Sequence, residues 1–355
     1  MPFSPSLSPL RRVLLALGLV SLAACGGGED AATAADGDAP LDAGEVNVYS
    51  GRHYDSDLEI FDAFTEETGI RVNVIEAGGD ALIERLAREG DASPADLFIT
   101  ADAGVLWRAD ERGVLAAIDD SALEDQVPEQ FRHPEGRWFG LAKRARIIIY
   151  NREAGLPDGL STYEDLADPA FEGMICIRPS SNVYNQSLLA SIIEHNGEAA
   201  AEDWARGVLA NVARKPQGND TSQIEAVAAG LCRLGVVNSY YVARFVGGEI
   251  GDQINVFYPN QGDDERGAHV NISGAGVTAH APNRENAVAL LRYLASDAVQ
   301  TKFALGNNEY PVVDGAPVDG PIAELGEFKA DALPAAALGE NQRLAVEIFN
   351  RTGWP

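Results

Sequence analysis

The chain has 355 residues and a formal net charge of −27, from 54 acidic and 27 basic side chains. This balance disfavours nucleic-acid binding, because proteins that bind phosphate backbones need a basic surface. Of the three cysteines, only two follow the first 25 residues, and this excludes a cysteine-rich zinc site in the body of the protein.

The first 25 residues have the pattern of a bacterial secretory signal. Arg11 and Arg12 precede a short apolar run, and small residues lead up to Cys25. The run is shorter than the roughly 20 apolar residues that a membrane-spanning helix needs. Its ending L-A-A-C resembles a lipobox, so we expect residues 1–24 to be removed and Cys25 to be lipidated. The alternative is an ordinary cleaved signal with a chance cysteine.

Residues 25–45 are expected to form a flexible acidic tether, because Leu41 is their one large apolar residue. The body that follows exceeds the size of a usual single core, so two lobes are expected. The predicted N-terminal lobe is residues 46–142 with a return segment at about 272–310, and the C-terminal lobe is residues 143–271 with terminal helices at about 316–355.

Short β-like runs alternate with amphipathic helical stretches through the body. Strands are expected at residues 46–50, 71–75, 95–100, 146–150, 173–178, 234–238 and 270–280. Helices are expected at residues 58–69, 81–90, around 105–107, 185–195, 200–212, 221–230 and 284–296. This alternation predicts an α/β fold with mostly parallel strands and helices on both faces. For two lobes, it predicts two mixed sheets with a ligand cleft between them.

Aromatic side chains follow three of the predicted strands, at the edge where open α/β sheets bind ligands. His53 and Tyr54 follow the first strand, and Tyr184 follows the strand that ends at residue 178. Tyr240 and Tyr241 follow another strand, with Ser239 as the predicted N-cap of their helix. In the first turn of a helix, two neighbouring hydroxyls can lean toward one space, whereas in a strand they point to opposite faces.

Phenol side chains can bind several classes of ligand. Phenols stack on sugars or enclose ammonium groups, although the four tryptophans that would usually complete a cage lie elsewhere in the sequence. A hard trivalent cation is the other choice, because a strong Lewis acid can deprotonate phenols whose pKa is normally about 10. Ferric ion fits that demand, and Arg144 and Arg244 would then balance the phenolate charge. Taken singly, His53 is more typical of a surface residue and a Tyr-Tyr pair of core or rim.

Cys176 and Cys232 remain once Cys25 is assigned to the lipobox. In an oxidising compartment they can pair in a disulfide, and the alternative is two buried thiols. No catalytic motif of a serine hydrolase, zinc protease or P-loop nucleotide hydrolase occurs, so the sequence does not predict an enzyme.

Six stretches together resemble the bacterial ferric-iron-binding periplasmic proteins. They are V-Y-S-G-R-H-Y (48–54), S-P-A-D-L-F-I-T-A-D (93–102), L-A-K-R-A-R (141–146), I-C-I-R-P-S-S-N-V-Y-N-Q-S (175–187), N-S-Y-Y-V-A-R (238–244) and N-I-S-G-A-G-V-T (271–278). Proteins of this family are the solute-binding components of iron ABC transporters, with a transferrin-like, type II periplasmic-binding architecture. The resemblance covers essentially the whole body.

The resemblance implies a set of roles and partners. Its iron ligands are Tyr54, Tyr184, Tyr240 and Tyr241, with His53 as a fifth ligand or close neighbour and Arg144 and Arg244 near the metal. It also implies a monomer in the periplasm or cell envelope that delivers Fe³⁺, or with fewer phenolates Fe²⁺, to an inner-membrane ABC permease and its ATPase. No carboxylate ligand is evident. The second hypothesis is a solute-binding protein for a sugar, polyamine or oxyanion.

Overall fold

The computed structural model describes residues 43–313 and 315–355. The predicted signal peptide, Cys25 and most of the tether therefore lie outside the described residues. Within the described part of the chain, no helix is both long enough and apolar enough to cross a membrane.

The strands form one mixed sheet of eight strands, in the order β2-β1-β3-β8-β4-β6-β5, with β7 paired to β4. They are β1 (Glu45–Ser50), β2 (Arg71–Glu76), β3 (Leu97–Thr100), β4 (Phe139–Asn151), β5 (Ile175–Cys176), β6 (Leu234–Asn238), β7 (Ile254–Phe257) and β8 (Val270–Val277). The pairs β1–β2, β1–β3 and β5–β6 are parallel, whereas β4 and β8 pair antiparallel with all their partners. The prediction of mostly parallel strands is therefore wrong.

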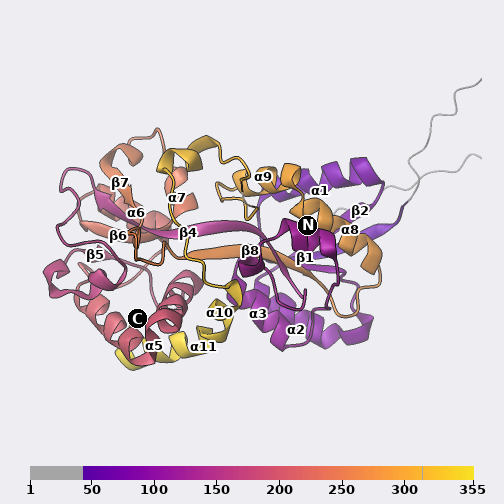
Figure 1. The fold of residues 1–355 in the computed structure, drawn as a ribbon, viewed down its shortest axis with the longest axis horizontal. Helices are drawn as coiled ribbons and strands as arrows, with labels where there is room; N and C mark the ends of the chain where they lie inside the picture. The colour runs from indigo at the N-terminus through magenta and orange to yellow at the C-terminus, as the bar shows by residue number, and fades with distance from the viewer. Residues whose placement is uncertain (1–42, 314) are drawn as a thin grey trace, which may run out of the picture. The chain divides into compact units, whose positions relative to one another are not determined.

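The prediction of two separate sheets is also wrong, because β4 is longer than the sequence indicated. Its first part pairs with β8, as far as Ala145 opposite Val270. From Arg146 onward it pairs with β6, and from Ile148 also with β7. One strand thus serves both sets of partners, and Figure 1 shows β4 and β8 running side by side between them.

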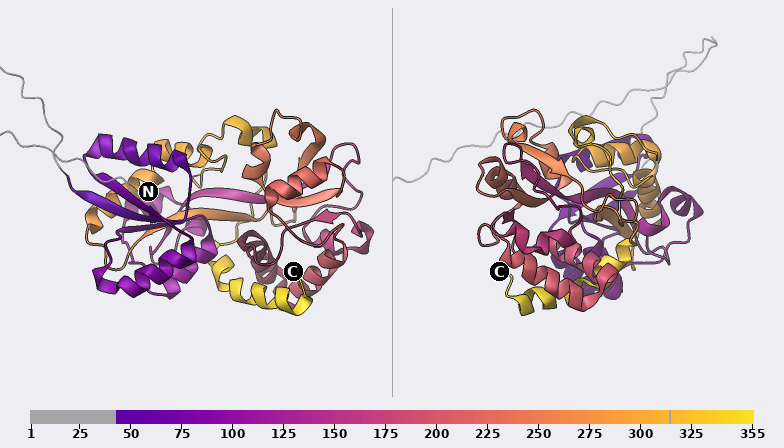
Figure 2. Two further views of the ribbon diagram at one scale, coloured as in Figure 1. Left: turned by 180° about the vertical axis from the view of Figure 1, so that it is seen from behind. Right: turned by 60° about the vertical axis from the view of Figure 1, so that its left-hand side comes forward.

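Helices cover both faces of the sheet. At the β1 end, α1 lies on one face while α2 and α3 lie on the other, as both views show (Figures 1 and 2). The α-helices are α1 (Asp55–Thr68), α2 (Gly79–Glu89), α3 (Ala103–Glu111), α4 (Ser121–Gln126), α5 (Val183–Ala210), α6 (Asp220–Ala228), α7 (Ser239–Ala243), α8 (Arg284–Ala295), α9 (Asp297–Leu305), α10 (Ala335–Glu340) and α11 (Gln342–Thr352).

The two helices predicted at 185–195 and 200–212 form α5, which is interrupted at Gly197 by a φ of 81°. Helix α1 ends as predicted at Gly69, whose φ of 76° is the left-handed conformation that glycine adopts without steric cost. It begins earlier than predicted, directly after Tyr54. Tyr54 is therefore the last residue of the segment that connects β1 to α1.

Close packing of β8 against β4 requires glycine. All eight residues of β8 are buried, and a Cβ added to Gly274 would lie 2.7 Å from the carbonyl oxygen of Phe139. A larger residue at position 274 would push β8 away from β4, the two central strands of the sheet. The glycines of the predicted strand at 270–280 therefore have a packing role.

Cys176 and Cys232 form a disulfide, and both residues are buried. The two cysteines are 56 positions apart in the sequence. A crosslink that closes a loop of this size restricts the unfolded chain and typically stabilises a protein by about 2–4 kcal/mol.

Replacing both cysteines with alanine is expected to lower the free energy of unfolding by about 2–4 kcal/mol, because the unfolded chain regains its freedom. Urea denaturation measures the change. The wild-type protein unfolded and refolded in reductant is the matched comparison, and it should lose the same stability. Equal midpoints for the oxidised wild type and the double variant would contradict the prediction.

Candidate metal site

Each predicted tyrosine lies where a strand or loop passes into a helix. Tyr54 is the N-cap of α1, just after β1, and Tyr184 is the second residue of α5. Asn182 fixes the start of α5, because its side chain accepts a hydrogen bond from the Tyr184 backbone N–H at 3.2 Å. Tyr240 and Tyr241 lie in α7, directly after β6.

The start of α7 differs from the prediction. Ser239 is the first helical residue and not the N-cap, which is Asn238. The Ser239 hydroxyl instead accepts a hydrogen bond from the backbone N–H of Ala145 at 3.3 Å. Since Ala145 lies in β4, this contact holds the short helix against the strand that both sets of partners share.

The structure brings the four tyrosines together. The hydroxyls of Tyr184 and Tyr240 are 3.0 Å apart, and the ring centroids of Tyr240 and Tyr241 are 4.4 Å apart. Tyr54 interacts electrostatically with both Tyr184 and Tyr240. Tyr184 and Tyr240 thus meet through their phenol oxygens, while Tyr241 packs against Tyr240 and Tyr54 lies within electrostatic range of both Tyr184 and Tyr240.

Burial keeps these phenols protonated in the absence of a cation. It raises the pKa of Tyr184 to about 12 and the pKa of Tyr240 well above its usual value, and it also raises the pKa of Tyr54. For Tyr240, the neighbouring phenols act in the same direction as burial. Phenolates would repel one another here, so this cluster is suited to a multiply charged cation that replaces the protons.

Both predicted arginines lie over the tyrosine rings. The Arg144 guanidinium is 5.7 Å from the Tyr184 ring centroid, and that of Arg244 is 5.2 Å and 4.9 Å from those of Tyr240 and Tyr241. Arg144 is buried, whereas Arg244 is exposed. These positions suit guanidinium groups that offset phenolate charge.

The sequence did not predict a buried ion cluster beside Tyr54. Arg52 is 1% exposed, and it donates hydrogen bonds to Asp57 at 2.7 Å and Glu309 at 2.9 Å. Its guanidinium also lies 4.7 Å from the Tyr54 ring centroid. Arg52 precedes the His-Tyr pair directly, but Glu309 follows it by more than 250 positions, so no local pattern indicates this pairing.

Glu309 is a carboxylate near the tyrosines, but its oxygens have other partners. They contact Arg52 at 2.9 Å and Arg144 at 3.7 Å, and they accept from the Ser273 hydroxyl at 3.3 Å. The carboxylate therefore orients arginines and is not presented as a free donor for a metal.

His53 is not enclosed with the tyrosines. Its side chain is 55% exposed, and its Nδ1 lies 3.2 Å from a carboxylate oxygen of Glu76. A metal-bound histidine usually has such a carboxylate on its other ring nitrogen. Because Glu76 contacts Nδ1, Nε2 is the ring nitrogen that remains available to a metal.

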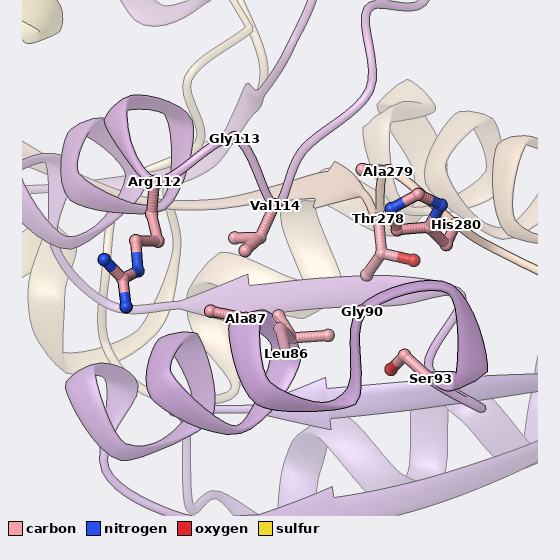
Figure 3. A pocket seen from close by; sticks show the side chains of 10 residues that line it. All are labelled: Leu86, Ala87, Gly90, Ser93, Arg112, Gly113, Val114, Thr278, Ala279 and His280. Carbon is pink, nitrogen blue, oxygen red and sulfur yellow. The ribbon is translucent and has the colours of Figure 1, made fainter.

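Other parts of the described chain offer no competing metal site. Among residues 43–313 and 315–355, no group of three or more His, Cys, Asp or Glu side chains is placed to hold a metal ion. A hollow of about 320 Å³ near the ends of α2 and α3 (Figure 3) is lined by Arg112 and His280 but by no tyrosine or carboxylate. Phenol oxygens therefore make the tyrosine cluster the best candidate.

Comparisons with known proteins show the family to which the chain belongs. Residues 92–330 match the family model described as bacterial extracellular solute-binding protein. Iron uptake protein A1 of Synechocystis sp. is 47% identical over 339 residues, which cover 94% of this chain and 93% of the relative. The chain belongs to the ferric-iron-binding periplasmic solute-binding proteins.

Two further proteins are similar to this chain, one in sequence and one in solved structure. The Fe(3+)-binding periplasmic protein of Serratia marcescens is 31% identical over 87% of this chain and 90% of its own. The solved Trichodesmium structure IdiA (FutA), in complex with iron and citrate ligands, is 49% identical with a TM-score of 0.84, covering 88% of this chain and all of that one. The family resemblance and the mixed α/β class predicted from the sequence are confirmed, as is the assignment to binding proteins rather than enzymes.

Proposed function

We propose that this protein captures ferric iron outside the cytoplasm through the phenolate oxygens of Tyr54, Tyr184, Tyr240 and Tyr241, and delivers it to an ABC permease and its ATPase. The observation that carries the proposal is the contact of Tyr184, Tyr240 and Tyr241 beneath the guanidinium groups of Arg144 and Arg244, with Tyr54 in electrostatic range. Membership of the family supports iron as the ligand. His53 is proposed as a fifth ligand, through Nε2.

The donor chemistry favours Fe³⁺. Three phenolates neutralise a trivalent ion and a fourth leaves the site negative, and the nearby arginines offset that excess. Hard anionic oxygen suits a hard trivalent metal. A polyamine fits less well, because the guanidinium groups that lie over the tyrosine rings would repel its positive charges.

Capture is proposed to proceed by closure around the ion. Tyr54 follows β1, while Tyr240 and Tyr241 follow β6, toward the opposite end of the sheet. Iron that first binds the ligands at one end favours the arrangement that brings in those of the other, because this arrangement adds metal contacts. The two predicted lobes, divided near residues 142 and 271, remain part of this proposal.

The proposed location is the outer face of a membrane. Cleavage after residue 24 and lipidation of Cys25 would tether a monomer near its permease, and the acidic tether would allow it to approach. Detergent partitioning of the full-length protein, compared with Cys25→Ala, tests the anchor. Equal partitioning of both would contradict it.

Titration of the mature protein with ferric citrate at neutral pH tests the ligand set. We expect a phenolate-to-iron absorption band in the visible range that saturates at one equivalent. Tyr240→Phe should weaken this band, because it removes one of the four proposed phenolate ligands. The visible spectrum and the endpoint of the titration are the measurements.

Tyr293→Phe is the matched control. Tyr293 lies on α8 against Phe64, away from the cluster, and phenylalanine keeps that ring contact. Its band should equal that of the wild type. A folded wild-type protein that develops no band would overturn the proposed ferric site and favour the sugar, polyamine or oxyanion hypothesis.

A further inference from the structure

A turn after α9 brings one amide side chain between the two groups of tyrosines. Asn307 lies two residues beyond the end of α9 and is 5% exposed. Arg244, which lies over Tyr240 and Tyr241, donates a hydrogen bond from Nη2 to Asn307 Oδ1 at 2.9 Å. The Asn307 side chain also lies within hydrogen-bonding range of Tyr54, where it acts against burial, the larger effect, on the pKa of that tyrosine.

The turn holds Asn307 in place through its backbone. The N–H groups of Asn307 and Glu309 both donate to the carbonyl of Ala304, at 3.2 Å and 2.8 Å. Asn308 between them has a φ of 56°, the left-handed conformation that ends many helices. The side chain at 307 is therefore fixed toward the site, in the same turn that sends Glu309 to Arg52.

The two polar atoms of the Asn307 side chain differ in their hydrogen bonding. Oδ1 is occupied by Arg244, whereas Nδ2 is buried with no hydrogen-bond partner in the described chain. A buried N–H donor without an acceptor is costly, and such a donor is stabilised when an anionic oxygen forms beside it. With Oδ1 held by Arg244, Nδ2 is the polar atom of this amide that remains to donate to Tyr54.

We propose that Asn307 is a positioning residue for iron capture, which donates from Nδ2 to the Tyr54 phenolate while its Oδ1 holds the exposed Arg244 over Tyr240 and Tyr241. This inference rests on the proposed function. It makes one amide the link between the ligand that follows β1 and the ligands that follow β6. Without it, Arg244 has the freedom of an exposed side chain, and the Tyr54 phenolate loses a neutral donor.

Asn307→Asp separates the two roles. It keeps an acceptor for Arg244 but removes the N–H donor and adds a negative charge beside the phenolates. We expect a 10–100-fold loss of ferric-ion affinity in competition with citrate, the range found when a group supporting a metal ligand is removed. Faster release to a chelator should account for most of the loss. The phenolate-to-iron band should move to longer wavelength, because a phenolate without its donor gives up electron density more readily.

Two further variants complete the test. Asn307→Ala removes both contacts and should also weaken binding and shift the band, which keeps the inference testable if the aspartate variant does not fold. Asn308→Gly is the matched control, because glycine keeps the left-handed turn, and its affinity and band should equal those of the wild type. A folded Asn307 variant within about twofold of wild type, with an unmoved band, overturns the role of Asn307. A wild-type protein without any band overturns the proposed function itself.

Discussion

Arg52→Met is expected to lower the free energy of unfolding by about 3–5 kcal/mol, the range for breaking a buried ion pair by removing one partner. Methionine has a similar length and keeps apolar contact with Phe303, whose ring centroid lies 4.1 Å from the guanidinium. It offers no donor to Asp57 or Glu309, which are 5% and 1% exposed. The loss thus reports a buried Asp57 without its cation, and a buried Glu309 that keeps only the more distant Arg144, in a medium that solvates charge poorly.

Urea denaturation of the metal-free protein measures this change. Arg343→Met is the matched control, because the Arg343 side chain is 91% exposed and pairs with Glu347 at 3.3 Å on the surface of α11. Exposed pairs contribute little, so this variant should stay within about 0.5 kcal/mol of wild type. A loss below about 1 kcal/mol for Arg52→Met would mean that water reaches Asp57 and Glu309, and that these ion pairs do not hold Tyr54 in place.

The tyrosines were predictable because their signal is local. Each follows a predicted strand, and such strand ends were expected to meet at one edge of a sheet. This reasoning holds for Tyr184 and Tyr240, because the strands before them, β5 and β6, are parallel neighbours. It does not hold for Tyr54, because β1 runs opposite to β6 in the sheet, and only the family resemblance placed Tyr54 in the same set. The disulfide between Cys176 and Cys232 was likewise expected as one of two alternatives, from the compartment that the leader sequence indicates.

The supporting contacts were not predictable, because their partners are far apart in the sequence. Arg52 pairs with Glu309 and Arg244 bonds to Asn307, and both partners lie in the turn that follows α9. No spacing of residue types in the sequence predicts the conformation of that turn. The single sheet was missed for a related reason. The apolar pattern of β4 is interrupted by Lys143, Arg144 and Arg146, which suggests a segment that crosses between two lobes. The two arginines are nevertheless buried, because Arg144 donates to Ser273 and Arg146 donates to Asp220.

The same contacts bear on how the site discriminates among ligands. The guanidinium groups over the tyrosine rings disfavour a polyamine, which carries several positive charges of its own. Only a cation that exchanges for protons turns the phenols into ligands that the arginines stabilise. The preference of the site for ferric ion then depends on the release of phenol protons, and the number of protons released can be measured.

Binding of ferric ion is expected to release close to one proton for each phenol that becomes a ligand, up to about four. Because burial raises the pKa values of Tyr54, Tyr184 and Tyr240, these phenols are protonated in the metal-free protein at neutral pH. They bind the metal as phenolates, so a falling pH restores the protons and displaces iron. The intrinsic affinity for Fe³⁺ should fall about tenfold per pH unit for each proton released.

Competition against citrate between pH 6 and pH 8, corrected for the protonation of the chelator and for hydrolysis of iron, gives the number of protons as a slope. Tyr240→Phe should lower this slope by about one, because it removes one proton from the exchange, whereas Tyr293→Phe should keep the wild-type slope. A slope near zero would mean that the phenols coordinate without losing protons, and tyrosinate ligation would then be wrong even if iron binds. A slope of about one or two would mean that some of the four phenols stay protonated beside the metal, which leaves the arginines less negative charge to balance.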